Sequence, residues 1–335
     1  MGKYNIGIVG ASGAVGVEMM LCLKNLNISM GELRLGGSSR SAGNIISTPF
    51  GDITIQEVGD DFFTGLDYAL FSAGGDISKQ YADIAVRSGA VVIDNSSAFR
   101  YDENVPLVIP QINGDAIGDA KIIANPNCTT AIAAVVLYPI YKQYGLQKIL
   151  MSTYQATSGA GAPGMQELLS NTQKYFNGEE PVVEQFAHNI SFNVIPHIDA
   201  FQENGYTKEE MKVTWETHKI FQDDSISISC TAVRIPTLRA HSESIILETK
   251  TPVDIDHIRE ILKNTSGVEL VDDPTNNMYP MPLNATGKYD VEVGRIRKNH
   301  VFGDRGVELF VSGDQLLRGA ALNAVEILQE CINNK

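Results

Sequence analysis

The chain has 335 residues, a length at which one hydrophobic core normally gives way to about two domains. Hydrophobic residues make up 43% and charged residues 20% of the sequence, which is typical of a folded globular protein. The formal net charge of -14 argues against binding to a nucleic-acid backbone, which requires a clustered cationic surface.

The N-terminus, MGKYNIGIVG, enters a strand pattern without the charged start and apolar run of a signal peptide. No apolar run reaches the roughly 18 residues that a membrane span requires. We therefore expect a cytoplasmic protein that begins here and has no membrane partner. The cysteines form no close pairs, so neither a sulfur-bound metal nor a disulfide framework is expected; they are Cys22, Cys128, Cys230 and Cys331.

The first third of the chain alternates short apolar strands with helical segments. Residues 3–9 predict a strand, and residues 17–26 carry apolar positions at helical spacing. This alternation predicts an α/β fold with a parallel, doubly wound, Rossmann-like sheet. Further strands are expected at residues 32–35, 68–71, 91–93 and 121–124.

Between the first strand and the first helix, three glycines follow a GxxGxxG spacing instead of GxGxxG. Glycines allow a tight turn that brings free amides at a helix N-terminus to a pyrophosphate. The spacing alone equally fits a plain turn from strand to helix, but the βα units around it favour a dinucleotide. The glycines are Gly10, Gly13 and Gly16.

The end of the second expected strand bears on the choice of cofactor. An NAD enzyme usually has an acidic residue there, whereas residues 36–41 contain glycines, serines and Arg40. An arginine and hydroxyls can bind a 2′-phosphate, so the segment favours NADP over NAD. The alternative is a solvated polar turn, since loops are often rich in serine.

Cys128 stands in NPNCTT, after an expected strand and before the helical stretch 131–141. At a helix N-terminus, the macrodipole and unpaired amides stabilise a thiolate, which makes the sulfur a competent nucleophile. The other three cysteines lie within apolar helical or strand patterns, and we interpret them as small buried hydrophobes.

A nucleophilic thiol explains how a nicotinamide enzyme could oxidise an aldehyde. The thiol adds to the carbonyl, the thiohemiacetal passes hydride to the cofactor, and an acyl thioester remains. Water or phosphate could capture the thioester, and composition leaves both possibilities open. The candidate anion-binding residues, any of which could instead be an ordinary surface charge, are Arg100, Lys212, Arg234 and Arg239.

Among the histidines, His241 follows Arg234 by seven residues in a strand-like stretch. In a regular strand this odd separation places the two side chains on opposite faces. Pro236 lies between them and can interrupt the strand. Periodicity alone therefore does not select His241 as a base.

Eight segments in this order resemble the aspartate-semialdehyde dehydrogenase family over nearly the whole chain. They are GASGAVG, SSRSAG, NSSAFR, NPNCTT, YQATSGAG, EEMK, RIPTLRAHS and DQLLRGAALNAVEIL. The resemblance implies an NADPH-dependent reductive dephosphorylation of L-4-aspartyl phosphate to L-aspartate 4-semialdehyde and phosphate. This is the branch-point step toward lysine, methionine and threonine.

The resemblance also implies a role for each matching residue. Cys128 carries the acyl thioester, and His241 is the general acid/base. Gln155 orients the substrate, Arg234 binds its carboxylate and Glu209 its amino group. Arg100 and Lys212 bind phosphate. Around the cofactor, the resemblance implies contacts from Ser12, Gly13, Ala14, Val15, Arg40, Ser41, Ser158, Gly159 and Gln315.

In this family, the implied architecture is a dinucleotide domain of residues 1–128 plus about 315–335, to which a helix at 316–331 returns. Residues 129–314 form an α+β substrate and dimerisation domain. The site is then expected between the domains, with Cys128 at their junction, in a homodimer.

Three rival interpretations remain open. N-acetyl-gamma-glutamyl-phosphate reductase uses the same chemistry, but its cysteine usually follows glycine, where this chain has Asn127. Glyceraldehyde-3-phosphate dehydrogenase resembles the chain poorly around the cysteine. A catalytically silent dinucleotide-binding sensor would keep the fold without turnover.

Overall fold

The computed structural model describes residues 2–334. The chain forms two compact units, each with its own sheet. The first unit comprises the residues up to Asn127 together with those from Ala320 onward, and the second runs from Cys128 to Gly319.

The sheet of the first unit has six strands, and all its neighbours pair in parallel. β1 lies between β2 and β6, and the order of the strands runs outward from β1 in both directions. The carboxyl ends of these strands therefore form the topological switch point, where such sheets bind ligands. In sheet order the strands are β5 (Gln56–Glu57), β2 (Met30–Gly37), β1 (Tyr4–Val9), β6 (Tyr68–Phe71), β7 (Val91–Asp94) and β8 (Ile122–Ala124).

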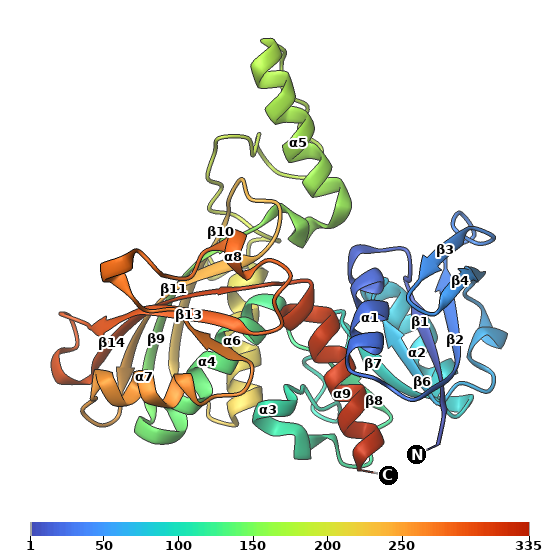
Figure 1. Cartoon of the computed structure of the whole chain (residues 1–335), viewed down its shortest axis with the longest axis horizontal. Coiled ribbons are helices and arrows are strands. Elements are labelled where there is room, and N and C mark those ends of the chain that lie inside the picture. The colour runs from blue at the N-terminus through green and yellow to red at the C-terminus, as the bar shows by residue number, and fades with distance from the viewer. Residues whose placement is uncertain (1, 335) are drawn as a thin grey trace. The chain divides into compact units, whose positions relative to one another are not determined.

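Helices pack against this sheet, as Figure 1 shows. The C-terminal helix α9 (Leu322–Asn333) contacts α1, α3 and β7, so the end of the chain is part of the first unit. A small antiparallel hairpin, β3 (Ile45–Thr48) and β4 (Gly51–Thr54), stands apart from the sheet. The other helices are α1 (Ala14–Asn25), α2 (Gly75–Arg87) and α3 (Pro110–Asn113).

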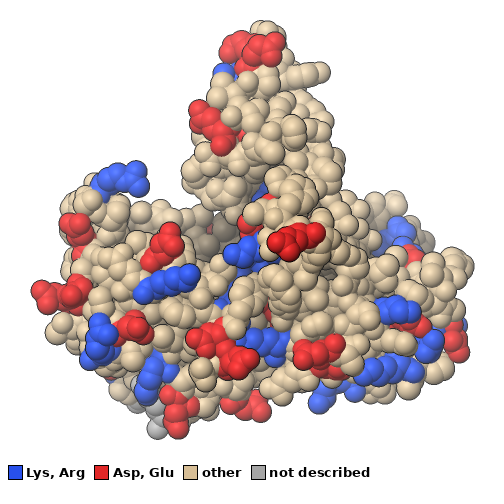
Figure 2. All heavy atoms as spheres, turned by 180° about the vertical axis from the view of Figure 1, so that it is seen from behind, with Lys and Arg blue, Asp and Glu red and all other residues tan. Residues whose placement is uncertain are grey.

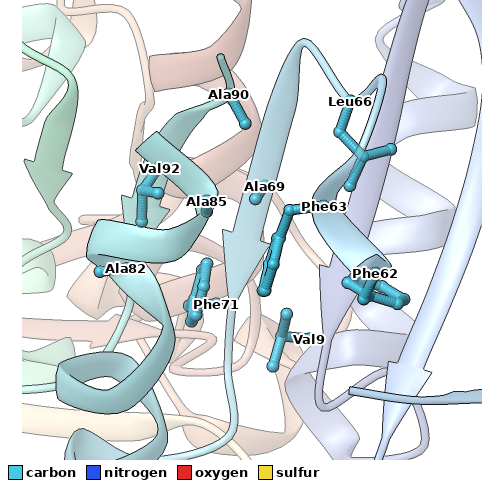
Figure 3. Packing of buried hydrophobic residues seen from close by; sticks show 10 residues of the cluster. All are labelled: Val9, Phe62, Phe63, Leu66, Ala69, Phe71, Ala82, Ala85, Ala90 and Val92. Atoms are coloured by element: carbon cyan, nitrogen blue, oxygen red, sulfur yellow. The ribbon is translucent and has the colours of Figure 1, made fainter. Parts of the chain in front are cut away.

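A core of aromatic and small aliphatic side chains lies between the sheet and α2 (Figure 3). Phe63 and Phe71 stack with ring centroids 5.9 Å apart, and both are fully buried. Alanines on α2 let the helix approach these rings closely. Val9 of β1 and Phe71 of β6, which are register partners at the carboxyl ends of these strands, both belong to this core.

The second unit has a mixed sheet of six strands. β9 lies between β10, which is parallel to it, and β11, which is antiparallel. In sheet order the strands are β10 (Ser227–Arg234), β9 (Leu146–Gln155), β11 (His241–Thr249), β14 (Gly306–Gly313), β13 (Val291–Lys298) and β12 (Val268–Leu270).

Three helices cover one face of this sheet, namely α4 (Cys128–Tyr144), α6 (Lys208–Phe221) and α7 (Ile255–Lys263). Alternation along β9 separates the faces: Ile149, Met151 and Thr153 are buried, whereas Leu150 and Ser152 are exposed. In Figure 1, α5 (Gly161–Asn177) projects away from the sheet as an arm. A short helix, α8 (Pro282–Ala285), precedes β13.

The α/β fold class is confirmed, with differences at element boundaries. The strand expected at residues 68–71 has those bounds, while the helix expected at 131–141 begins earlier, at Cys128. The single helix expected at 316–331 is divided into a π-helical turn, Leu317–Ala321, and α9. Across residues 2–334, no helix is long and apolar enough to span a membrane.

Candidate active site

Three predicted site residues come together at one end of adjacent strands in the second sheet: Gln155, Arg234 and His241. β9 ends at Gln155 and β10 ends at Arg234, and these two residues are register partners. β11 begins at His241 on the other side of β9, with Ser242 opposite Tyr154. Arg234 and His241 do not share one regular strand: residues 235–240, which include Pro236, leave the strand, and the two residues lie on different strands.

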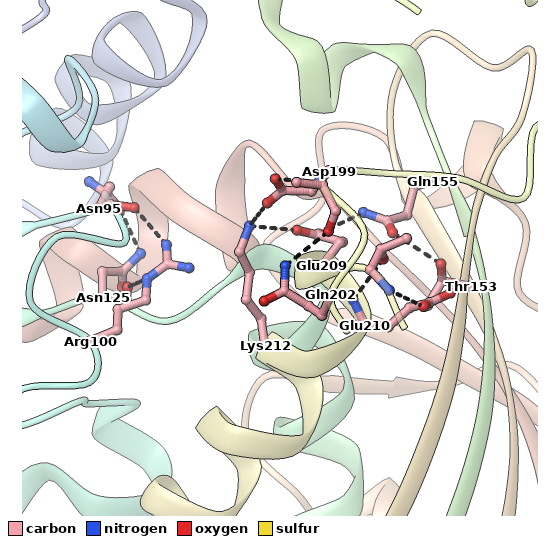
Figure 4. Close-up of polar contacts among 12 residues, drawn as sticks. Asn95, Arg100, Asn125, Thr153, Gln155, Asp199, Gln202, Glu209, Glu210 and Lys212 are labelled. Carbon is pink, nitrogen blue, oxygen red and sulfur yellow. Dashed lines mark hydrogen bonds and ion pairs between the residues drawn. The ribbon is translucent and has the colours of Figure 1, made fainter. Parts of the chain in front are cut away.

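A chain of hydrogen bonds and ion pairs leads outward from Gln155, as Figure 4 shows. Thr153 Oγ1 donates to Gln155 Oε1 at 3.0 Å, and Gln155 Nε2 donates to Glu209 Oε1 at 3.1 Å. The ammonium of Lys212 lies 2.9 Å from Glu209 Oε2 and 2.8 Å from Asp199 Oδ2. Gln155 and Glu209 are therefore fixed before any substrate arrives.

The local sequence of α6 explains the position of Glu209. Thr207 and Glu210 form a reciprocal capping box that starts the helix. Glu210 Oε1 also accepts a hydrogen bond from Ala232 N at 2.9 Å, which docks the helix onto β10. Glu209 and Lys212 are consequently held in the first turns of α6, facing the end of the sheet.

Lys212 is a mostly buried cation. Burial disfavours its charge, but the carboxylates of Glu209 and Asp199 outweigh that effect and raise the pKa of the ammonium above its usual value. Lys212 is therefore charged at neutral pH, with two anionic partners that any incoming phosphate must compete against.

Arg234 is a buried cation of a different kind. It is 6% exposed, and its Nη1 donates to Ala156 O at 2.6 Å. Among residues 2–334, no carboxylate lies within ion-pair distance of it. Burial lowers the pKa of the guanidinium, while the charges of Glu209 and Cys128 act in the opposite direction. A buried guanidinium without an anionic partner is suited to binding a carboxylate.

His241 is fully buried, and Ala156 N donates a hydrogen bond to its Nδ1 at 3.0 Å. Burial and the nearby charge of Arg234 lower the pKa of His241 to about 3, so the ring is neutral at neutral pH. Because Nδ1 accepts a hydrogen bond, the ring proton is on Nε2. In the described part of the chain, Nε2 has no hydrogen-bond partner.

Gly159 provides the space beside both side chains. A Cβ at this position would lie 2.6 Å from Arg234 Nη1 and 3.5 Å from His241 Nε2. Any larger residue would displace Arg234. The arrangement of Arg234 therefore requires a glycine at position 159, which is also a predicted cofactor contact.

Cys128 is the first residue of α4, where the helix has its positive end. It is half-buried, whereas the other three cysteines are buried. Gly319 packs directly against it, since a Cβ there would come within 2.6 Å of Cys128 Cβ. This contact was not predicted, and only the position of Gly319 before two alanines in LLRGAA could have suggested it.

Gln315 and Ser158, both expected at the nicotinamide end of the cofactor, lie together in the second unit. Gln315 Nε2 donates to Ser158 Oγ, and Gln315 Oε1 accepts from Ala240 N at 2.8 Å. Ala240 immediately precedes His241. Arg239, another candidate for anion binding, forms an ion pair with Asp314 at 2.7 Å.

In the first unit, the predicted pyrophosphate residues surround the start of α1. Ser12 and Gly13 are exposed, and Ala14 and Val15 are the first two residues of the helix. No side chain caps this end, and its first turn contains no acidic residue. Gly16 is required for the turn, because a Cβ there would lie 2.5 Å from Gly10 O. The helix end therefore fits an anionic group.

The predicted 2′-phosphate residues lie in a turn after β2. Ser41 N donates to Ser38 O at 2.9 Å, and Arg40 is exposed on this turn. Arg100 is anchored elsewhere in the same unit. Its Nε donates to Asn125 O at 2.8 Å and its Nη2 to Asn95 O at 2.7 Å, as Figure 4 also shows.

The structure thus divides the predicted residues between the two units. Two further residues were not predicted: Asp199, which contacts Lys212, and Phe186, which contacts Arg234. Each comes from a loop whose position depends on tertiary packing. In the second unit lie Cys128, Gln155, Ser158, Gly159, Glu209, Lys212, Arg234, His241 and Gln315. In the first unit lie Ser12, Gly13, Ala14, Val15, Arg40, Ser41 and Arg100.

Comparison with known proteins gives consistent matches over both units. Residues 5–120 match the semialdehyde dehydrogenase NAD binding domain, and residues 137–318 match the semialdehyde dehydrogenase dimerisation domain. The aspartate-semialdehyde dehydrogenase of Aquifex aeolicus is 46% identical over 331 residues, which cover 97% of each chain. That of Bacillus subtilis is 46% identical over 339 residues, covering 98% of each chain.

The solved structures agree with these sequence relatives. A crystal structure of aspartate semialdehyde dehydrogenase II complexed with ASA, from Vibrio cholerae, superposes with a TM-score of 0.96 at 41% identity and covers 99% of both chains. The rival interpretations are not favoured by these relatives. The chain belongs to the aspartate-semialdehyde dehydrogenase family and is a dinucleotide-dependent oxidoreductase.

Proposed function

We propose that the enzyme reduces L-4-aspartyl phosphate to L-aspartate 4-semialdehyde with NADPH, releasing phosphate, through a thioester on Cys128. The observation that carries this proposal is Arg234, a buried guanidinium with no carboxylate partner in the described chain. A substrate carboxylate would complete it with paired, charge-assisted hydrogen bonds. Glu209, which accepts a hydrogen bond from Gln155, can also accept hydrogen bonds from the substrate's ammonium group.

Cys128 begins the reaction by attacking the acyl carbon and expelling phosphate, which leaves an aspartyl thioester. The positive end of α4 favours the thiolate that this attack requires. A side chain at Gly319 would collide with the Cβ of Cys128, so the glycine leaves room for the nucleophile. Arg100 and Lys212 are the proposed phosphate ligands.

His241 stabilises the oxygen on which negative charge develops when the thioester is reduced. Its neutral ring offers Nε2–H, since Nδ1 is occupied by Ala156 N. The tetrahedral alkoxide then collapses, the C–S bond breaks, and the semialdehyde and the Cys128 thiolate are released. The proton of the overall reaction goes to the departing phosphate. For His241 to act as a base through Nε2, its proton would have to move to Nδ1, which the Ala156 hydrogen bond opposes.

The cofactor supplies the hydride when it is bound. The uncapped N-terminus of α1, with Ser12, Gly13, Ala14 and Val15, suits its pyrophosphate. Arg40 and Ser41 are the proposed 2′-phosphate ligands, and Ser158, Gly159 and Gln315 the ligands at the nicotinamide end. The lack of a capping side chain and of an acidic residue in the first turn of α1 supports this assignment.

The enzyme is proposed to be a cytoplasmic homodimer. Residues 137–318 match a family model described as a dimerisation domain. Within the second unit, α4, α6 and α7 cover one face of the sheet, while the opposite face exposes Leu150 at 41%. We propose that this open face is covered by a second copy of the chain.

The decisive experiment runs the reaction in reverse. Purified protein with L-aspartate 4-semialdehyde, NADP and phosphate should form NADPH, and omission of phosphate should abolish that formation. N-acetylglutamate semialdehyde should give no comparable rate. NADPH formation that is independent of phosphate, or a preference for the acetylated substrate, would overturn the proposal.

A further inference from the structure

The segment that returns from the arm α5 carries an aromatic ring to Arg234. The centroid of the Phe186 ring lies 5.7 Å from the guanidinium carbon, within the distance of a cation–π contact. Phe186 also packs against the apolar cluster of Leu168, Ile190 and Ile195. Its ring is therefore supported from behind by the arm and faces a charged group in front.

Two sets of hydrogen bonds hold this segment in place. On one side of Phe186, Glu167 Oε2 accepts from Glu184 N at 3.0 Å and from Gln185 N at 2.6 Å. On the other side, Ile195 and Arg234 exchange backbone hydrogen bonds of 3.0 and 2.8 Å. Phe186 is thus fixed between α5 and the end of β10.

Phe186 and Arg234 line the same small cavity, of about 120 Å³, together with Ala160, Ile195 and Asp199. Arg234 Nη1 is already occupied by Ala156 O. The ring of Phe186 limits the space on one side of the guanidinium, and the N–H groups that Ala156 O does not use remain along the edge of the group. An incoming carboxylate binds best to that edge, in the plane of the group.

We propose that Phe186 is a positioning residue that determines substrate affinity by fixing the plane of Arg234 for the substrate carboxylate. This inference rests on the proposed function, in which Arg234 binds that carboxylate. Phe186 acts on binding through Arg234 and touches no reacting atom, so its effect is confined to steps in which the carboxylate is bound.

The test compares Phe186→Leu with the wild type in the phosphate-dependent assay. Loss of the aromatic face should raise KM for L-aspartate 4-semialdehyde about three- to tenfold, with kcat changed less than about twofold. KM for phosphate should not change. In an Arg234→Lys background, the same substitution should add less than about a twofold increase in KM.

Phe192→Leu is the matched control, because Phe192 is an aromatic residue of the same returning segment that is 62% exposed and packs against Tyr175 and Phe176. It should leave both KM values unchanged. If Phe186→Leu does not fold, Phe186→Met, which also lacks a π face, takes its place.

The outcomes separate this inference from the proposed function. An inactive wild type would refute the proposed function. An active wild type with an unchanged Phe186→Leu variant would refute only the role of Phe186. A fall in kcat instead of a rise in KM, or an undiminished effect in the Arg234→Lys background, would also refute that role.

Discussion

Ala156 constrains the role proposed for His241. Its backbone N–H donates to Nδ1, and the fully buried ring has a pKa of about 3. The lowered pKa means that the ring stays neutral well below pH 5. His241 is therefore a hydrogen-bond donor of constant charge over the pH range in which enzymes are normally assayed.

His241→Asn removes this donor from its place beside Arg234. We expect turnover to fall by about two orders of magnitude or more, because a preorganised donor to a developing oxyanion is lost. The residual activity should keep the wild-type pH dependence between pH 5 and 8, since His241 does not titrate there. Initial rates across this range check both points. Activity within a few-fold of wild type would contradict the assignment.

Single residues were predictable from sequence where a local motif carried them. Cys128 before a helix and the glycines after the first strand needed only their neighbours. The roles of Asp199 and Gly319 could not be predicted in this way. Asp199 contacts Lys212, which is 13 residues away in the sequence, and Gly319 contacts Cys128 from the other end of the second unit. Contacts of this kind depend on tertiary packing, which no local pattern encodes.

The turn after β2 carries the residues that are proposed to select the cofactor. Arg40 is exposed there and available to a 2′-phosphate. Arg40→Ala should raise KM for NADPH about tenfold while leaving KM for NADH nearly unchanged, because only NADPH carries that phosphate. Steady-state kinetics with both cofactors measure the difference. Equal effects on the two would mean that Arg40 does not discriminate between them.

The strongly apolar elements were predicted well and the polar ones were not. Tyr68–Phe71 is buried throughout and has the predicted bounds. β5 is the two-residue strand Gln56–Glu57 and is exposed, so it has no apolar signal to detect. The interruption before α9 was missed because a π-helical turn keeps the apolar content of a helix while changing its hydrogen-bond spacing.

For the molecule as a whole, the surface is acidic on balance but carries both signs. The face in Figure 2 shows basic and acidic side chains interspersed. For the proposed homodimer, the face of the second sheet that exposes Leu150 offers apolar surface to a second copy.

Leu150 on that face provides a test of assembly. Leu150→Asp places a charge where the second copy is proposed to pack, so the variant should sediment as a monomer at concentrations where the wild type is a dimer. Val17→Asp, at a residue of the first unit with the same 41% exposure, is the matched control and should not change the sedimentation coefficient. A dimeric Leu150→Asp variant would show that the contact lies elsewhere.

Global stability should also depend on one carboxyl group in the second sheet. Glu243 is fully buried, and in the described chain neither of its oxygens has a hydrogen-bond partner. Burial raises the pKa of Glu243 well above its usual value. The folded protein therefore binds a proton that the unfolded chain loses, so this residue's contribution to stability falls as pH rises above about 4.5.

Glu243→Gln removes this titration at nearly constant shape. Thermal unfolding from pH 5 to 8 should show a smaller decline in Tm for the variant, with the largest gain at pH 8. Each kcal/mol corresponds to about 2 to 4 °C for a domain of this size. Glu203→Gln, at an exposed position, is the control and should not alter the pH dependence. Parallel curves for wild type and Glu243→Gln would contradict the interpretation.

Because Cys128 is less buried than the other three cysteines, labelling of its thiol can count the active enzyme molecules in a preparation. Cys22, Cys230 and Cys331 are buried, and burial raises the pKa of the Cys230 thiol, whereas Cys128 is half-buried at a helix start. A mild alkylating reagent should therefore label one site per folded chain, and activity should disappear in proportion to the label incorporated. Mass spectrometry of the labelled peptide would then give the fraction of competent enzyme in any preparation. Labelling of several cysteines at similar rates would show that Cys128 has no special reactivity.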